Sequence, residues 1–163
     1  MSKLSDKQIA EYFQRCYTAV DGLWFMKVEE KFGFDTALDI DNEVWKVLPK
    51  IQARKLKAAL KTEQIGIKAL HDCLSARLDI ESFEFETEQT EDEKSLTITI
   101  KNCPWHNLLL KSGRENLSEK IGSKICNTEY SVWAAEFGEN IKFELKNQIC
   151  KGDNCCVLHF SKD

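Results

Sequence analysis

The stretch IKFELKNQICKGDNCCVLHF, residues 141–160, decides how the end of this chain folds. Its first part, Ile141–Lys146, alternates apolar with charged residues, which is typical of a strand with one face in a core and one in water. Glycine and short polar residues between positions 150 and 155 then favour a turn. An apolar pattern returns at Val157–Phe160. The stretch therefore predicts a closing antiparallel hairpin.

A second hairpin is predicted upstream. Residues 83–88 and 96–101 each alternate apolar with polar side chains, and the charged segment Thr90–Glu93 separates them. Between the two hairpins, helical spacing of apolar residues runs from Ser118 to Phe137, and Gly138 is a suitable stop. We expect the four strands to form one antiparallel sheet.

The first half of the chain has helical rather than strand periodicity. Ser5 or Asp6 is a suitable cap for a first helix, Gly33 a suitable end, and Pro49 fits the first turn of a later helix. The apolar residues of the first helix follow three- and four-residue spacing: Ile9, Phe13, Cys16, Val20 and Leu23. We predict an α+β fold, with a helical subdomain (1–81) packed on an α+β subdomain (82–163) that carries a cysteine cluster.

Composition excludes several functional classes. The chain has 163 residues, 27 acidic and 23 basic, with a formal net charge of −4. Mild acidity argues against nucleic-acid and anionic-membrane partners, which require a basic face. No apolar run approaches the roughly 20 residues of a membrane span, and the N-terminal residues lack a signal-peptide core. We therefore expect a cytoplasmic protein.

Seven cysteines are the unusual feature of this composition. Cytosolic thiols stay reduced, so clustered cysteines there indicate metal or redox chemistry more often than disulfides. Strand alternation assigns Cys150 and Cys155 to the polar face of the last hairpin and Cys156 to the apolar face. In the strand that precedes Cys103, the same alternation puts position 103 on the polar face.

These cysteines suggest a zinc site. Zinc takes about four thiolate or imidazole ligands in a tetrahedron. Cys126, Cys150 and Cys155 are three candidates, and Cys103 or His106 is the fourth. Two alternatives remain open: the cysteines are small buried hydrophobic residues, or they form a disulfide across the hairpin.

The tail, Cys126 together with residues 143–160, resembles the end of the 4-vinyl reductase domain family. That family includes small archaeal proteins, a bacteriochlorophyll-biosynthesis protein and the sensor domains of phenol-responsive bacterial activators. In those sensors the matching cysteines bind zinc beside a ligand pocket, so the resemblance implies zinc ligands at Cys126, Cys150 and Cys155. Asn147 stands where the sensors have an acidic fourth ligand.

Segments of the first half, 21–25, 28–33 and 41–45, resemble a small prokaryotic family described by similarity to L-2-amino-thiazoline-4-carboxylic acid hydrolases. This resemblance covers most of the chain. It implies hydrolysis of a small cyclic C–N substrate as an alternative function.

Aromatic residues of the helical half are candidates for the wall of a small, partly apolar ligand pocket. At helical spacing, the alternative is that they belong to the core. The candidate ligand-binding residues are Tyr12, Tyr17, Asp21, Trp24, Phe25 and Trp45.

The sequence thus favours a small-molecule-binding or sensor-like module with a structural zinc ion. The alternatives are the thiazoline-type hydrolase and a protein that binds a tetrapyrrole or an iron–sulfur cluster, since four thiolates also suit such a cluster. The broad apolar surface of the first helix is expected to be buried either within the chain or against a second copy, so a homodimer remains open.

Overall fold

In the computed structural model, which describes residues 3–62 and 64–162, the first helix α1 (Asp6–Phe32) begins at a reciprocal side-chain cap. The Gln8 backbone N–H donates to Ser5 Oγ at 3.3 Å, and the Ser5 backbone N–H donates to Gln8 Oε1 at 2.9 Å. Two otherwise unsatisfied donors are thereby paired. The helix ends at Gly33, whose φ of 84° suits glycine. Both ends of the predicted first helix are confirmed.

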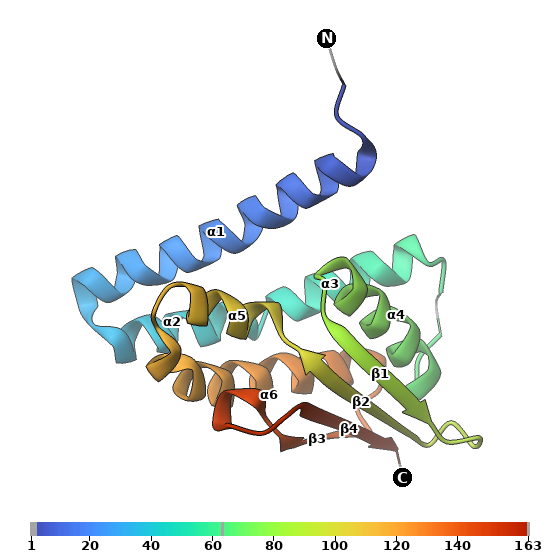
Figure 1. Ribbon diagram of the computed structural model, residues 1–163. Coiled ribbons are helices and arrows are strands. Elements are labelled where there is room, and N and C mark those ends of the chain that lie inside the picture. The colour runs from blue at the N-terminus through green and yellow to red at the C-terminus, as the bar shows by residue number, and fades with distance from the viewer. Residues whose placement is uncertain (1–2, 63, 163) are drawn as a thin grey trace. The chain divides into compact units, whose positions relative to one another are not determined.

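The remaining elements follow in the order that Figure 1 shows. They are α2 (Phe34–Trp45), α3 (Leu48–Ala59), α4 (Ile67–Ile80), β1 (Glu84–Gln89), β2 (Ser95–Asn102), α5 (Pro104–Lys111), η1 (Glu115–Leu117), α6 (Ser118–Phe137), β3 (Ile141–Asn147), η2 (Ile149–Lys151) and β4 (Cys156–Lys162).

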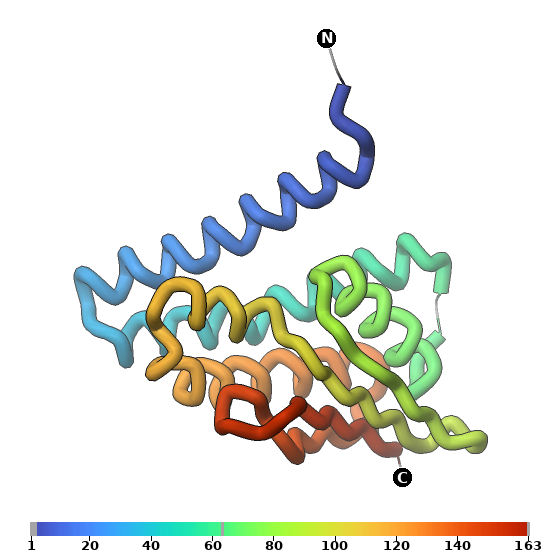
Figure 2. The backbone as a smooth tube through the Cα atoms, viewed as in Figure 1, coloured from blue at the N-terminus to red at the C-terminus, as the bar shows by residue number. Residues whose placement is uncertain are grey.

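The α+β prediction is confirmed: the four strands form one antiparallel sheet, in the order β1-β2-β4-β3. β2 and β4 are distant in sequence but run side by side in the sheet centre, as the chain trace shows (Figure 2). Their register pairs Leu96 with Phe160 and Ile100 with Cys156. On the opposite face, Thr97 Oγ1 lies 3.1 Å from His159 Nδ1. One face of the sheet is therefore apolar and the other polar, as the alternation predicted.

Helices α4 and α6 cover the apolar face of the sheet. Leu70, Leu74 and Leu78 of α4 are fully buried, because their four-residue spacing places them on one side of the helix. Trp133 and Phe137 of α6 stack with ring centroids 6.0 Å apart. These side chains and the inward residues of β2 and β4 form one continuous core.

The chain divides into two compact units, one up to Asp41 and a second from Asn42 onward. The sequence-based boundary lay instead between residues 81 and 82. The difference arises because α3 and α4 pack against α6 and the sheet, so they belong to the same unit as the strands. The first unit consists of α1 and most of α2.

Among the described residues, no helix is long and apolar enough to cross a membrane.

Candidate functional site

The second unit contains a buried ion triad made of Arg77, Glu81 and Glu129. Arg77 Nε donates to Glu81 Oε1 at 3.0 Å, and Arg77 Nη2 lies 2.9 Å from Glu81 Oε2. The same Nη2 lies 2.5 Å from Glu129 Oε1. Because the guanidinium group is planar and carries several donors, it can pair with both carboxylates at once. The triad joins α4 to α6 inside the unit.

Further side chains from neighbouring elements hold Glu81. Gln52 Nε2 of α3 donates to Glu81 Oε1 at 3.3 Å, and Trp105 Nε1 of α5 donates to Glu81 Oε2 at 3.3 Å. The Trp105 ring meets Trp45 edge-to-face, with centroids 5.9 Å apart. Three helices, α3, α4 and α5, therefore meet at a single carboxylate.

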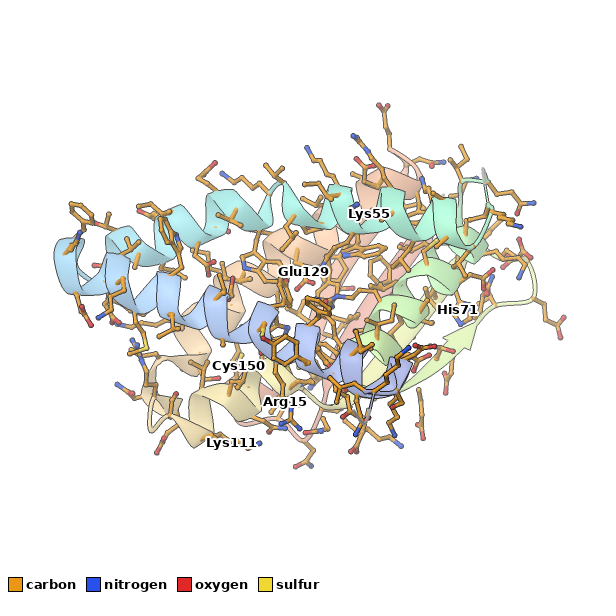
Figure 3. All side chains as sticks on the ribbon, turned by 90° about the horizontal axis from the view of Figure 1, so that it is seen from above. Arg15, Lys55, His71, Lys111, Glu129 and Cys150 are labelled. Atoms are coloured by element: carbon orange, nitrogen blue, oxygen red, sulfur yellow. The ribbon has the colours of Figure 1, made fainter. Side chains whose placement is uncertain are left out.

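Glu129 is the most perturbed carboxyl of this centre. Burial raises its pKa to about 7, the positive charge of Arg77 lowers it in part, and the negative charge of Glu81 raises it again. A raised carboxyl pKa is expected where desolvation outweighs pairing. Glu129 lies in the interior of the second unit, as Figure 3 shows by its label. Strongly perturbed groups of this kind gather at functional sites more often than elsewhere.

Next to the ion triad, four cysteines from four different elements form what we call the thiol cluster. They are Cys103 at the start of α5, Cys126 on α6, Cys150 on η2 and Cys156 at the start of β4. Burial first, then the negative charges of Glu129, Cys103, Cys156 and Cys150, raise the pKa of Cys126 well above its ordinary value. Thus Cys126 interacts with each of the other three thiols.

The other thiols of the cluster are also hard to ionise. Burial raises the pKa of Cys103 and of Cys150, and it raises that of Cys156 to about 12. The thiols are free rather than joined in disulfides. Without a bound cation, the four thiols are therefore neutral at physiological pH.

A glycine on α6 makes room for the cluster. A Cβ at Gly122 would lie 2.7 Å from Cys150 Sγ and 4.0 Å from Cys126 Sγ. Contacts below about 3 Å do not occur between real Cβ atoms and their neighbours, so an alanine at this position would displace the Cys150 thiol. Only a residue without a side chain lets η2 approach α6 this closely.

The structure brings Cys156 to this place, whereas the sequence-based zinc set contained Cys155. Cys156 pairs with Ile100 in the register and therefore faces the core, and Cys156 Sγ accepts from the Ile149 backbone N–H at 3.2 Å. Cys155 precedes the strand and is half-buried, and it too interacts with Cys156, whose pKa it helps to raise, so it lies next to the cluster. The fourth candidate, His106, places Nδ1 2.7 Å from Ser118 Oγ.

The donor chemistry of the thiol cluster fits a thiophilic metal ion such as zinc, which takes four thiolates in closed structural sites. Within residues 3–62 and 64–162, however, no three Cys, His, Asp or Glu side chains are already arranged as ligands of one ion. Binding a metal would therefore require the thiol side chains to turn toward a common centre.

The candidate ligand-binding residues belong to separate units. Tyr12 and Trp24 are exposed on α1, and Phe25 packs edge-to-face against Phe34 with centroids 5.9 Å apart. Tyr17 and Asp21, also on α1, are half-buried. Trp45 lies in the second unit, where it is buried against Trp105. Trp45 thus joins the core, which was the alternative interpretation of these aromatic residues.

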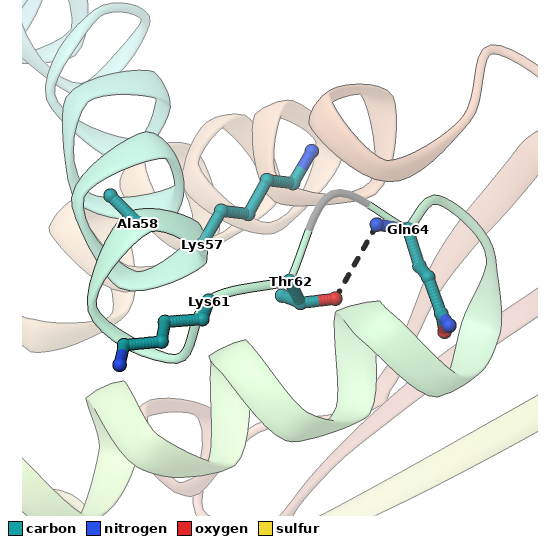
Figure 4. Close-up of a pocket in the computed structure, with 5 residues that line it drawn as sticks. All are labelled: Lys57, Ala58, Lys61, Thr62 and Gln64. Atoms are coloured by element: carbon teal, nitrogen blue, oxygen red, sulfur yellow. Dashed lines mark hydrogen bonds between the residues drawn. The ribbon is translucent and has the colours of Figure 1, made fainter.

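A surface hollow of about 550 Å³ lies away from the thiols, at the end of α3 (Figure 4). It is lined by Lys57, Ala58, Lys61, Thr62 and Gln64. Lys57 Nζ already donates to the Glu136 carbonyl at 2.5 Å and lies 4.2 Å from the Phe137 ring centroid. The ammonium group of Lys57 therefore already interacts with other groups of the protein. None of the predicted site residues lines the hollow.

Sequence reasoning missed the ion triad, although a signal was present. Arg77 follows Leu74 by three residues and Glu81 follows Arg77 by four, so both occupy the buried side of α4. Glu129 lies midway between Ile125 and Trp133 at the same helical spacing. Charged residues at core positions on two helices predict a buried ion pair.

Comparison with known proteins gives one family. Residues 1–160 match the model of a family of unknown function, DUF6125. The chain belongs to this family. The match spans both units, including α1 and the thiol cluster. A search of curated proteins finds no match to the chain.

Proposed function

We propose that this DUF6125 protein is a small-molecule-binding or sensor-like module in which a zinc ion, bound by the thiol cluster, stabilises the second unit. The observation that carries the proposal is the convergence of Cys103, Cys126, Cys150 and Cys156 from four elements, with Cys126 and Cys150 beside Gly122. Four thiolates leave no open coordination position, so the ion would be structural.

Electrostatics sets a condition for a cation at this place. Neutral thiols must lose protons to bind zinc, and burial opposes that loss at Cys126 and Cys156. A divalent cation reverses the balance, because its charge stabilises thiolates directly. Metal uptake should therefore release protons and weaken as the pH falls.

The ion triad gives the site a rigid neighbour. Arg77 fixes α4 to α6, which carries Cys126, and Trp105 ties Glu81 to α5, which follows Cys103. Two of the four thiols are thus attached to elements that a buried network holds in place. Such support reduces the cost of ordering the ligands around an ion.

The zinc claim is tested by metal analysis of the full chain, purified under reducing conditions after growth with added zinc. We expect a zinc-to-chain ratio close to one. Cys126→Ser should remove the metal and lower the melting temperature, while Cys16→Ser, on α1, should change neither. A ratio near zero in the unaltered protein would contradict the proposal.

Two cysteine variants distinguish the ligand set that the geometry favours from the one that the family resemblance implies. The geometry favours Cys156 as a ligand, and the resemblance to the 4-vinyl reductase domain family implies Cys155. We expect Cys156→Ser to lose zinc and Cys155→Ser to retain it. The reverse result would support the ligand set of the phenol sensors.

The small-molecule part of the proposal rests on that resemblance alone. Simple phenols are the appropriate first probes, because the resembling sensors respond to them. A rise in melting temperature with phenol concentration would support binding, and unchanged melting across a panel of substituted phenols would remove phenols as the ligand class.

The alternative hydrolase function has one observation in its favour. The Glu129 carboxyl has a pKa of about 7 and lies beside Arg77, which suits a group that exchanges protons at neutral pH. Turnover of a thiazoline carboxylate by the unaltered protein, lost in Glu129→Gln, would support it. If turnover did not exceed background, the hydrolase alternative would be removed and the binding module would remain the proposed function.

The donor set also suits an iron–sulfur cluster, and the family resemblance also suggests a tetrapyrrole. An absorption spectrum of anaerobically purified protein distinguishes both from zinc. A zinc protein is colourless, whereas a cluster or a tetrapyrrole absorbs visible light.

A further inference from the structure

A second set of polar side chains, which shares no residue with the ion triad or the thiol cluster, lies where α4 packs against β1. His71 of α4 places Nδ1 3.0 Å from Asp72 Oδ1 and Nε2 3.1 Å from Thr87 Oγ1 of β1. One imidazole thus joins a carboxylate to a hydroxyl, as in enzymes that transfer acyl groups through a hydroxyl nucleophile. His71, labelled in Figure 3, is 27% exposed and Thr87 is half-buried, so a substrate can reach both.

The two hydrogen bonds fix the position of the imidazole proton. Burial acts to raise the pKa of Asp72, but the hydrogen bond with His71 and the charge of Lys68 lower it overall. Lys68 Nζ lies 3.5 Å from the second carboxylate oxygen, Asp72 Oδ2. An ionised carboxylate only accepts, so Nδ1 of a neutral His71 carries the ring proton and donates it to Asp72. Nε2 is then the acceptor for the hydroxyl proton of Thr87.

The backbone of β1 offers a hydrogen-bond donor beside the Thr87 hydroxyl. β1 is an edge strand, because the order of the described strands is β1-β2-β4-β3. Thr90 donates to the Ser95 carbonyl, so the residues of β1 that bond to β2 lie an even number of positions from Thr90. Thr87 lies three positions away, and its N–H and C=O therefore point off the sheet edge. A negatively charged oxygen that forms on a substrate carbonyl requires a donor of this kind.

We propose that Thr87, His71 and Asp72 form an acyl-transfer site that hydrolyses a small ester. Thr87 Oγ1 bonds to the carbonyl carbon of the ester while its proton passes to His71 Nε2. The bond from that carbon to the alcohol oxygen breaks, and the alcohol leaves with the proton from His71. Water then bonds to the acyl carbon and gives a proton through His71 to Thr87 Oγ1, which releases the acid. Asp72 is a positioning residue, because it orients the imidazole without touching the substrate.

This inference does not depend on the zinc site, and a fluorophosphonate probe tests it in the full chain. Such probes label hydroxyl groups that a neighbouring base activates, and peptide mapping by mass spectrometry locates the label. We expect the label on Thr87. His71→Gln should lower the labelling rate by at least about a hundredfold, the lower end of general-base contributions. Thr87→Val should abolish labelling, and Thr87→Ser should retain it.

Thr97→Val is the matched control. Thr97 Oγ1 also lies 3.1 Å from a histidine nitrogen, His159 Nδ1, but on the opposite face of the sheet. Its replacement should leave the label on Thr87 unchanged. Far-ultraviolet circular dichroism must show that each variant keeps its secondary structure.

Two further measurements test turnover and the role of Asp72. Hydrolysis of p-nitrophenyl acetate should decrease in Thr87→Val and His71→Gln together. Nitrogen-15 NMR of His71 should place the ring proton on Nδ1, and Asp72→Asn should move part of it to Nε2. The proposal would be overturned by a Thr87 that takes no label, by labelling that His71→Gln leaves unchanged, by equal ester hydrolysis in Thr87→Val and the unaltered protein, or by a ring proton that Asp72→Asn does not move.

Discussion

Helices α1 and α6 have the same kind of apolar periodicity but different environments. On α6, Ile125, Tyr130, Trp133 and Phe137 are buried against α3, α4 and the sheet. On α1, a longer helix, no residue is buried. The periodicity therefore predicts a helix and its apolar side, and only tertiary structure shows what covers that side.

The same contrast applies to the cysteines of the two helices. Cys126 of α6 interacts with three thiols from other elements, and Glu129 of the same helix belongs to the ion triad. Cys16 of α1 lies one turn from Tyr12, and their side chains interact, which raises the pKa of Tyr12. Chemistry therefore concentrates where elements from distant parts of the sequence meet.

The largest expected difference concerns a buried and an exposed arginine. Arg77→Met leaves Glu81 and Glu129 buried without their cation, so it should lower the free energy of unfolding by about 3–5 kcal/mol. Arg15→Met on α1 should change it by less than about 0.5 kcal/mol. Urea denaturation of both variants measures the difference. Equal stabilities would show that the ion triad is not a structural tie.

A leucine pair tests the difference in packing. Leu74→Ala removes a fully buried side chain of α4 and should cost about 2–5 kcal/mol. Leu23→Ala on α1, where the side chain is 57% exposed, should cost less than about 0.5 kcal/mol in dilute protein. Urea denaturation of both variants in dilute protein is the appropriate measurement. A large loss of stability for Leu23→Ala would mean that this side chain is covered within the monomer.

Glu129 predicts a pH dependence of stability. Its pKa is about 7 in the folded protein against an ordinary value of 4.5. The folded state therefore holds a proton that the unfolded state has lost, and stability falls as the pH rises between these two values. The loss should continue until the pH has passed through about 7, the pKa in the folded protein, and amount to roughly 3 kcal/mol in all.

The control for this slope is a carboxylate on the other helix. Glu129→Gln should flatten the stability profile between pH 4.5 and 7, the interval between the two pKa values. Glu11→Gln on α1 should keep the slope of the unaltered protein. If the profile of Glu129→Gln matched the unaltered one, Glu129 would not be the group that titrates.

The smallest expected effects come from one glycine in each helix. Nothing lies within 4 Å of a Cβ built on Gly22 of α1, so Gly22→Ala should raise the free energy of unfolding by about 0.5–1 kcal/mol. Gly122→Ala should not raise the free energy of unfolding in this way, because its Cβ must displace the Cys150 side chain. Thermal denaturation measures both variants. An equal gain in both would mean that Cys150 moves away at no cost.

Much of the fold was predictable because its signals are local. Gly138 ends α6 at the predicted residue, and Ser5 and Gly33 bound α1 as expected. The sequence predicted helices between the two hairpins, but it gave no bounds for the short α5. Its start signal, Pro104 after an extended Cys103, was present, but eight residues give too little periodicity to separate a helix from a turn.

The candidate site was only partly predictable, because it depends on contacts between distant residues. Strand parity assigned Cys156 to the apolar face, and it faces the core. The sequence argument treated that burial as packing alone. It gave no means to see that Cys103 and Cys126, from two other elements, end beside it. The ion triad required the same kind of information, since Arg77 and Glu129 are 52 positions apart in the chain.

The central claim is that the thiol cluster holds one metal ion. Its most direct test is the zinc content of the reduced, full-length protein and of Cys126→Ser, measured on the same preparation scale. We predict a ratio close to one in the unaltered protein and close to zero in Cys126→Ser, with Cys16→Ser unchanged. A metal-free unaltered protein that remains folded would contradict the claim and leave the four cysteines as packing residues of the core.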